Sequence, residues 1–174
     1  PGFFDKMKQA DHYVYLDSVQ YRKNYFQNRN KVIDRNDVVS WLSVPVKFDK
    51  DEWTQPFHMV KISPLHPWKN KYLGKITSCY SKYPFFKKYY PEIEHIINNS
   101  PDTICKLNIE IINFFRNILN INTKTSFSSE IITDLSKSEL LAHIAFHLNA
   151  DTYLSGPSGK EYLNTDIFYE NEID

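Results

Sequence analysis

The chain has 174 residues and a formal net charge of zero, because 21 acidic residues balance 21 basic ones. This balance argues against a general nucleic-acid binder and against a polybasic membrane-surface protein. No apolar run approaches the roughly 20 residues that span a bilayer, and no signal peptide is visible, so we expect a cytoplasmic protein without membrane insertion. The two cysteines form no CxxC motif, so reduced and buried thiols are expected at Cys79 and Cys105. The length fits one domain over residues 1–174.

The first part of the chain predicts a helix, a strand and then a binding loop. Apolar side chains fall at helical spacing over residues 3–10, and residues 12–16, HYVYL, alternate and are rich in β-formers. The polar stretch LDSVQYRKNYFQNRNK follows over residues 16–31. In open α/β sheets, ligands bind beyond the carboxyl ends of strands, so this stretch is a candidate binding loop. The alternative is a solvated connection whose aromatic side chains pack back on the core.

The next elements form a predicted β-hairpin followed by helices. Two strands, over residues 30–33 and 38–46, flank an Asn36-Asp37 turn, and Pro45 suggests either the end of the second strand or an edge position. A short strand is expected over residues 59–62. Helical spacing of apolar side chains then predicts helices at residues 68–82, 85–98 and 103–119. In the third helix the predicted core-facing stripe is Ile104, Leu107, Ile111, Phe114, Phe115 and Ile118.

The last third of the chain predicts a βαβ unit. A strand over residues 123–127 ends at Ser128-Ser129, which we interpret as hydrogen-bonding groups for an anion or hydroxyl at a strand end. A helix opens at residue 136 or 137 and stops at Asn149, a residue that favours the left-handed conformation. A further strand over residues 151–155 would then run parallel to the first.

Two short motifs in this region suggest chemistry. The loop from Gly156 to Lys160, GPSGK, resembles the end of a phosphate loop, although it lacks the P-loop spacing and Pro157 removes a donor. A position after a parallel strand would put it on the same sheet edge as the Asp17 loop. His143 and His147 are four residues apart on a helix, but without HExxH or nearby cysteines we predict that they bind no metal.

Several segments, taken in order, resemble the WbqC-like family. They are FFDKM, QADHYVYLDSVQYRKNYFQNRNKV, WLSVPVK and ELLAHIAFHLNADTYLSGPSGKEYL. The resemblance runs from Pro1 to about Phe168, but a His-Gln-Pro motif usual in the family before "GFF" is missing, so natural sequence is expected to be lacking at both ends. The positions matching family motifs are Asp17, Gln20, Lys23, Asn28, Arg29, Ser155 and Gly156. The resemblance implies a bacterial protein of surface-polysaccharide (O-antigen) or secondary-metabolite biosynthesis, in a family with members described as glycine or aminoacyl transferases acting on amino sugars.

Together these observations predict a single α/β domain with a small mostly parallel sheet, a β-hairpin and four to five helices. The predicted function is acyl or aminoacyl transfer to an amino sugar or similar metabolite; the alternative is a noncatalytic module that binds a nucleotide-sugar or glycan. A small-molecule substrate, no cofactor and no nucleic-acid partner are expected, and the oligomeric state stays open. We predict catalytic roles for Asp17 and Ser155, and substrate-binding roles for Gln20, Lys23, Asn28, Arg29, Gly156, Ser158 and Lys160.

The predicted site has a specific geometry. Asp17, Arg29 and Ser155 are expected to meet at one sheet edge. Arg29 would be the main anion anchor, because a guanidinium binds phosphate or carboxylate in a two-pronged fork. The alternative for Arg29 is a structural ion pair with Asp17 or Asp34.

Overall fold

The chain forms two compact units, and the sequence of one unit is inserted between the two parts of the other. The computed structural model of the protein describes residues 2–47, 54–65 and 67–174, with side chains at all of these except 157–158. The terminal unit contains residues 1–19 and 120–174, and the middle unit contains residues 20–119. Each unit has its own hydrophobic clusters and is described by itself.

The middle unit contains the predicted β-hairpin. Strands β2 (Arg29–Ile33) and β3 (Val39–Ser43) are antiparallel, with Arg29 opposite Ser43 and Lys31 opposite Trp41. The Asp34 carboxylate fixes the turn, because it accepts hydrogen bonds from the backbone N–H groups of residues 36 and 38 at 2.8 and 3.0 Å. β3 ends before Pro45, as the sequence predicts, and the short strands β4 (Val46–Lys47) and β5 (Lys61–Ile62) pair beyond it.

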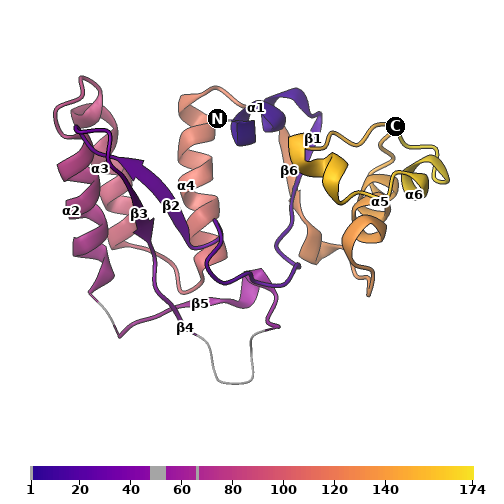
Figure 1. Cartoon of the computed structure of the whole chain (residues 1–174), viewed down its shortest axis with the longest axis horizontal. Helices are drawn as coiled ribbons and strands as arrows, with labels where there is room; N and C mark the ends of the chain where they lie inside the picture. Colours follow the sequence, from indigo (N-terminus) through magenta and orange to yellow (C-terminus); the bar gives the residue numbers. More distant parts are fainter. Residues whose placement is uncertain (1, 48–53, 66) are drawn as a thin grey trace. The chain divides into compact units, whose positions relative to one another are not determined.

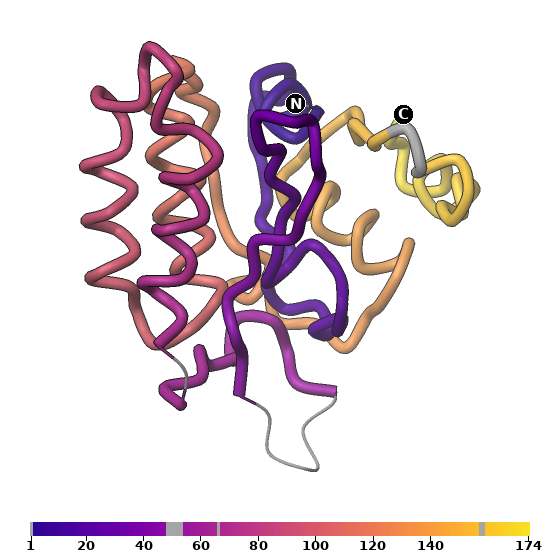
Figure 2. The backbone as a smooth tube through the Cα atoms, turned by 60° about the vertical axis from the view of Figure 1, so that its left-hand side comes forward, coloured from indigo at the N-terminus to yellow at the C-terminus, as the bar shows by residue number. Residues whose placement is uncertain are grey.

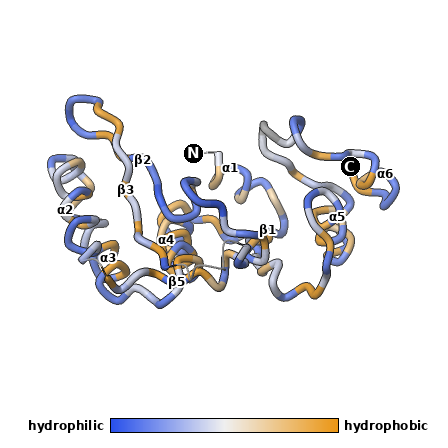
Figure 3. Tube along the Cα trace, turned by 60° about the horizontal axis from the view of Figure 1, so that its bottom comes forward, coloured by the Kyte–Doolittle hydropathy of each residue, from blue (hydrophilic) through white to orange (hydrophobic). Residues whose placement is uncertain are grey.

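Three helices complete the middle unit and confirm the predicted helical segments. α2 (Trp68–Tyr80), α3 (Phe86–Asn98) and α4 (Ile104–Ile118) stand side by side in both Figure 1 and Figure 2, and the short helix η1 (Phe57–Met59) contacts α4. Apolar positions recur along α4 (Figure 3), and two of them, Ile104 and Leu107, are core residues. The core residues of this unit are Tyr21, Val44, Val60, Trp68, Leu73, Ile96, Ile97, Ile104 and Leu107.

The predicted stripe of α4 is only partly correct. Ile104 and Leu107 are fully buried, but Phe115 is 37% exposed and packs edge-on against Phe114 with ring centroids 5.2 Å apart. Ile111 and Phe114 are partly buried against the same core, so of these positions it is Phe115 that departs from the prediction. Cys79 and Cys105 are buried free thiols, as expected.

The terminal unit is organised around one pair of parallel strands. β1 (His12–Tyr15) lies beside β6 (Lys124–Phe127) in Figure 1. Their parallel pairing places Tyr15 opposite Phe127. α1 (Gly2–Gln9) is attached by a hydrogen bond from the Thr123 hydroxyl to the Met7 carbonyl at 2.7 Å. The remaining elements are η2 (Ser128–Glu130), α5 (Lys137–His147), η3 (Pro157–Glu161) and α6 (Asp166–Tyr169).

The predicted strand over residues 151–155 is wrong, and so is the βαβ unit built on it. Asn149 stops α5 in the left-handed conformation as predicted, with φ at 53°. The following backbone, however, pairs with the last residue: Tyr153 N–H donates to the Asp174 carbonyl at 2.6 Å, and Asp174 N–H to the Asp151 carbonyl at 2.9 Å. The parallel partner of β6 is instead β1. The α/β class, with parallel strands and a β-hairpin, is confirmed; six α-helices lie in the described residues.

Candidate functional site

A buried carboxylate lies where the two parallel strands of the terminal unit end. Asp17 follows β1 by two residues and is only 5% exposed. Ser128, which follows β6 directly, has no exposed surface, whereas Ser129 beside it is exposed. Since β1 and β6 are parallel, their carboxyl ends adjoin, and this is the region where α/β sheets bind ligands.

Three donors bind the Asp17 carboxylate. Oδ1 accepts from the Ser129 backbone N–H at 2.8 Å and from the Ser128 hydroxyl at 3.2 Å. Oδ2 accepts from the Ser129 hydroxyl at 2.7 Å. Hydrogen bonds to an ionised group are stronger than neutral ones, so these contacts hold the carboxylate in one orientation.

Ser18 extends this cluster by one further hydroxyl. Its backbone N–H donates to Ser128 Oγ at 3.1 Å, and the two hydroxyl oxygens are 2.8 Å apart. A hydroxyl carries one proton, and Ser128 gives its own to Asp17, so Ser18 must be the donor to Ser128. The result is a directed chain of hydrogen bonds from Ser18 through Ser128 to Asp17.

A second polar pair joins the first residue of β1 to the third residue of β6. His12 Nε2 is 2.9 Å from the Ser126 hydroxyl. Burial, and then the positive charge of Lys124 on the neighbouring strand, lower the pKa of His12. A neutral imidazole nitrogen can accept the Ser126 proton.

Two tyrosines of the terminal unit, Tyr13 on β1 and Tyr153 after α5, stay protonated at neutral pH. Burial raises the pKa of Tyr13 to about 12, with smaller contributions from Tyr15 and Tyr153. Burial, followed by Tyr162, likewise raises the pKa of Tyr153 to about 12. Neither phenol is therefore available as a base under ordinary conditions.

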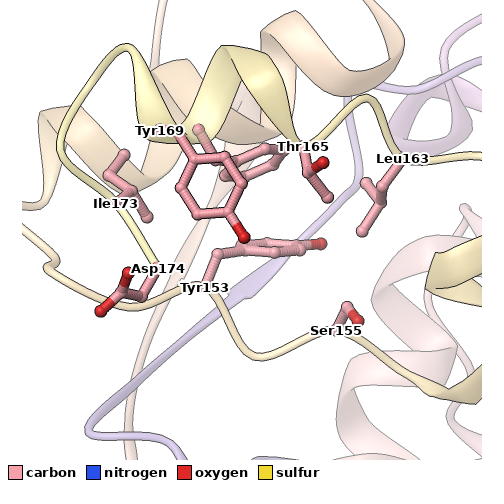
Figure 4. Close-up of a pocket in the computed structure, with 8 residues that line it drawn as sticks. Tyr153, Ser155, Leu163, Thr165, Tyr169, Ile173 and Asp174 are labelled. Atoms are coloured by element: carbon pink, nitrogen blue, oxygen red, sulfur yellow. The ribbon is translucent and has the colours of Figure 1, made fainter.

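Ser155 lies on a small cavity of the terminal unit. The cavity has a volume of about 110 Å³ and is lined by Tyr153, Ser155, Leu163, Thr165, Phe168, Tyr169, Ile173 and Asp174. In Figure 4 the Tyr153 and Tyr169 side chains lie in the middle of this set, with Ser155 at one end and Asp174 at the other. The Ser155 hydroxyl donates to the Gly156 carbonyl at 3.3 Å.

The glycine loop after Ser155 is a tight helical turn. Gly159 N–H donates to the Gly156 carbonyl at 2.8 Å, so this donor is already used. A Cβ at Gly159 would stand 2.6 Å from Ser155 Oγ, which explains the glycine there, whereas Gly156 has open space around it. Lys160 is exposed, and the side chain of Ser158 lies outside the described residues.

The polar loop of the middle unit is tied to β2 and β3. Asn28 and Val44 exchange two hydrogen bonds, from Asn28 Nδ2 at 2.9 Å and from Val44 N–H at 2.8 Å. The Arg29 guanidinium stacks 4.0 Å from the centre of the Trp41 ring and donates through Nη2 to the Asn24 carbonyl. Lys23 and Gln20 are exposed.

The predicted meeting of Asp17, Arg29 and Ser155 stays a prediction. Arg29 belongs to the middle unit and the other two residues to the terminal unit. Within the terminal unit, Asp17 is bound by Ser128 and Ser129, and Ser155 lies on the cavity.

The sequence did not predict that the serines at the two strand ends form one hydrogen-bonded cluster with Asp17. Ser128 and Ser129 are hydrogen-bonding groups at a strand end, but their acceptor is the chain's own Asp17, so the binding of an external anion or hydroxyl stays a prediction. Ser18 was missed altogether. The available signal was that two β-rich segments, HYVYLDS and TKTSFSS, both end in short polar residues.

The described residues hold no group of three or more His, Cys, Asp or Glu side chains that could bind a metal ion. On α5, His143 is half-buried and His147 is exposed. In the same described ranges, no helix combines the length and apolar character needed to cross a membrane.

Comparison with known proteins identifies the family. The sequence model of the WbqC-like protein family matches residues 1–174. The chain belongs to the WbqC-like family. It is also 27% identical over 173 residues to a Mycobacterium tuberculosis protein named "Uncharacterized protein Rv1507c", covering 99% of this chain and 74% of that relative. No solved structure matches the chain. Membership of this family is consistent with a role in bacterial biosynthesis.

Proposed function

We propose that this WbqC-like protein transfers an acyl or aminoacyl group to an amino sugar or a similar small metabolite in bacterial surface-polysaccharide or secondary-metabolite biosynthesis. The observation that carries the proposal is the 2.7 Å hydrogen bond from the exposed Ser129 hydroxyl to the buried Asp17 carboxylate. A serine beside a fixed base is the arrangement used in covalent catalysis. In this proposal the reaction takes place in the cytoplasm.

Ser129 is the nucleophile and Asp17 the base. Ser129 Oγ forms a bond to the carbonyl carbon of the donor while the bond from that carbon to the leaving heteroatom breaks. The Ser129 proton passes to Asp17 Oδ2 and on to the leaving group. The acceptor amine then attacks the acyl-serine ester, and its proton returns through Asp17 to Ser129 Oγ. The reacting carbonyl contacts Ser129, and only the leaving group and the amine reach Asp17 Oδ2 beside it, because Asp17 is 5% exposed.

Ser128 and Ser18 position the base. The Ser128 hydroxyl and the Ser129 backbone N–H both bind Oδ1, which leaves Oδ2 directed at the Ser129 hydroxyl. Ser18 in turn orients the Ser128 hydroxyl by donating to its oxygen. Neither residue takes part in bond formation.

Intact-mass measurement tests this proposal. The chain is incubated with N-acetylcysteamine thioesters of acetate and glycine, and glucosamine is then added as acceptor. We expect an added acyl mass that glucosamine removes and that Ser129→Ala abolishes. Ser126→Ala is the matched control, because it removes a hydroxyl from β6 that bonds to His12 and leaves the Asp17 cluster intact. An adduct that persists in Ser129→Ala would remove Ser129 as the nucleophile.

A noncatalytic binding module for a nucleotide-sugar or glycan is the second candidate. It is favoured by the mutual hydrogen bonds of the Asp17 cluster, which satisfy both carboxylate oxygens without any substrate. Hydrogen bonds that hold two strand ends together are a sufficient structural role for this cluster, without catalysis. Equal ligand binding by the unmodified chain and Ser129→Ala, with no acyl adduct from either thioester, would favour this candidate.

A further inference from the structure

The β-hairpin of the middle unit has one face turned to its core and one turned to solvent. Val32 and Leu42 are buried with Cys79 of α2 on the inner side. Side chains alternate along a strand, so their neighbours Lys31 and Trp41 project from the opposite side. We define the outer hairpin face as Arg22, Tyr25, Phe26, Arg29, Lys31 and Trp41.

Aromatic rings form a continuous exposed row on the outer hairpin face. Tyr25 is 48%, Phe26 54% and Trp41 42% exposed. The centre of the Phe26 ring lies 5.7 Å from that of Tyr25 and 5.6 Å from that of Trp41. Exposed rings in contact with one another offer a platform on which a flat ligand can stack.

Basic side chains are fixed against these rings. The Arg29 guanidinium is 4.0 Å and the Lys31 ammonium 5.5 Å from the centre of the Trp41 ring, and the Arg22 guanidinium is 4.8 Å from that of Tyr25. These are cation–π distances. Between Asp17 and Asp34 the sequence holds no acidic residue, and strand β3 holds none either. The face therefore combines aromatic surface with positive charge.

Arg29 adds an unused donor. Its Nε is buried and has no hydrogen-bond partner in the described part of the chain. Buried polar groups are normally paired, so this nitrogen is an unsatisfied donor next to the outer hairpin face. Meanwhile Nη2 binds the Asn24 carbonyl, which keeps the guanidinium stacked on Trp41.

We propose that the outer hairpin face binds a nucleoside diphosphate group. The base stacks on the exposed rings of Trp41 and Phe26, and the diphosphate oxygens contact Lys31 and Arg22. A neutral glycan would use the rings but not the cations, and inorganic phosphate would use the cations but not the rings. The inference rests on the proposed function only for its choice of ligand, because an amino sugar for biosynthesis can be carried on a nucleotide.

Calorimetric titration of the chain tests the proposal with UDP, ADP and dTDP, and with uridine and inorganic pyrophosphate as the separate halves. We expect at least one nucleoside diphosphate to bind more tightly than either half. Trp41→Leu should weaken that binding by about 5- to 150-fold, the effect of losing one base–aromatic stack. Lys31→Gln should weaken it several-fold and reduce its dependence on salt, because one phosphate contact is lost.

Matched variants control for nonspecific effects. Phe85→Leu removes an exposed ring elsewhere in the middle unit, and Lys61→Gln removes an exposed lysine from β5. Both should bind the nucleotide as the unmodified chain does. Trp41→Phe keeps a ring and should retain most of the affinity, so the proposal stays testable if Trp41→Leu does not fold.

Three results would overturn the inference: no binding of any of the three diphosphates, equal binding by Trp41→Leu, or pyrophosphate binding as tightly as the nucleotides. These titrations involve no turnover, so they are independent of the acyl-adduct assay. If nucleotide binding is lost in Trp41→Leu and Ser129 forms no adduct, nucleotide binding by the outer hairpin face is supported and acyl transfer is rejected. An adduct without nucleotide binding would do the reverse.

Discussion

The two polar regions of this protein use their side chains in opposite ways. At the strand ends of the terminal unit, Asp17 and its serines bind one another, and the carboxylate is 5% exposed. On the outer hairpin face of the middle unit, rings and cations contact each other but keep large surfaces in solvent, with Trp41 42% exposed. A dense run of polar residues in a sequence therefore does not predict whether their side chains are buried or exposed. Substitutions should change stability in the first region and ligand binding in the second.

The largest expected effect comes from the main hydrophobic cluster of the middle unit, to which Leu107 belongs. Leu107 on α4 has no exposed surface, so Leu107→Ala should cost roughly 2–5 kcal/mol of unfolding free energy. Denaturant unfolding measures this cost. Phe115→Ala on the same helix is the comparison and should cost clearly less, because that ring is 37% exposed. Equal losses would mean that the two halves of α4 are buried alike.

Removing the carboxylate should have the next largest effect. Asp17→Ala leaves the donors of Ser128 and Ser129 without their acceptor, at a cost of about 2–4 kcal/mol. Asp17→Asn keeps the shape and an accepting oxygen, so its loss of stability should be smaller. It should still abolish the acyl adduct, because an amide is no base. A stable Asp17→Ala protein would show that the cluster is not buried as described.

Substitution of Arg29 should have a smaller effect on stability. Arg29→Ala loses the stack on Trp41 and the hydrogen bond to the Asn24 carbonyl, both at a half-exposed position. We expect a loss of about 1 kcal/mol in thermal or chemical unfolding. If Arg29 instead formed the alternative ion pair with Asp17, a double-mutant cycle of Arg29→Ala with Asp17→Asn would reveal coupling between them. Additive losses would argue against that pair.

The smallest effect concerns pH. Burial and Lys124 lower the pKa of His12 in the folded chain below its ordinary value of 6.5. The unfolded chain then binds the proton more readily, so the stabilising contribution is present above about pH 6.5 and is lost as the pH falls below it. NMR titration of the His12 ring should give a pKa under 6.5, and Lys124→Gln should raise it. A pKa above 6.5 would contradict the environment described for His12.

Much of the local structure could be predicted from the sequence. Helical spacing gave α2, α3, α4 and α5 within a few residues, because the apolar face of each helix must reach a core. The hairpin followed from two β-rich segments around a short polar turn. Asn149 predicted the end of α5, because asparagine tolerates the left-handed conformation that stops a helix.

The strand partners could not be predicted in the same way. β1 and β6 are separated by more than a hundred residues, and no local sequence pattern predicts that they pair. The segment at residues 151–155 had the composition of a strand, yet its backbone bonds to the last residue of the chain. Strand formation depends on an available partner, and that partner is decided by tertiary packing.

By itself, the sequence determined helices α1 to α5, the hairpin, the family and the candidate status of Asp17 and Arg29, because side-chain periodicity, turn residues and motifs are local properties. Only the tertiary structure decided that Asp17 is bound by Ser128 and Ser129, and that Arg29 stacks on Trp41. The physical reason is that hydrogen bonds and ring contacts require distances of a few ångströms. The parallel pairing of β1 with β6 and the register of β2 with β3 bring those atoms together.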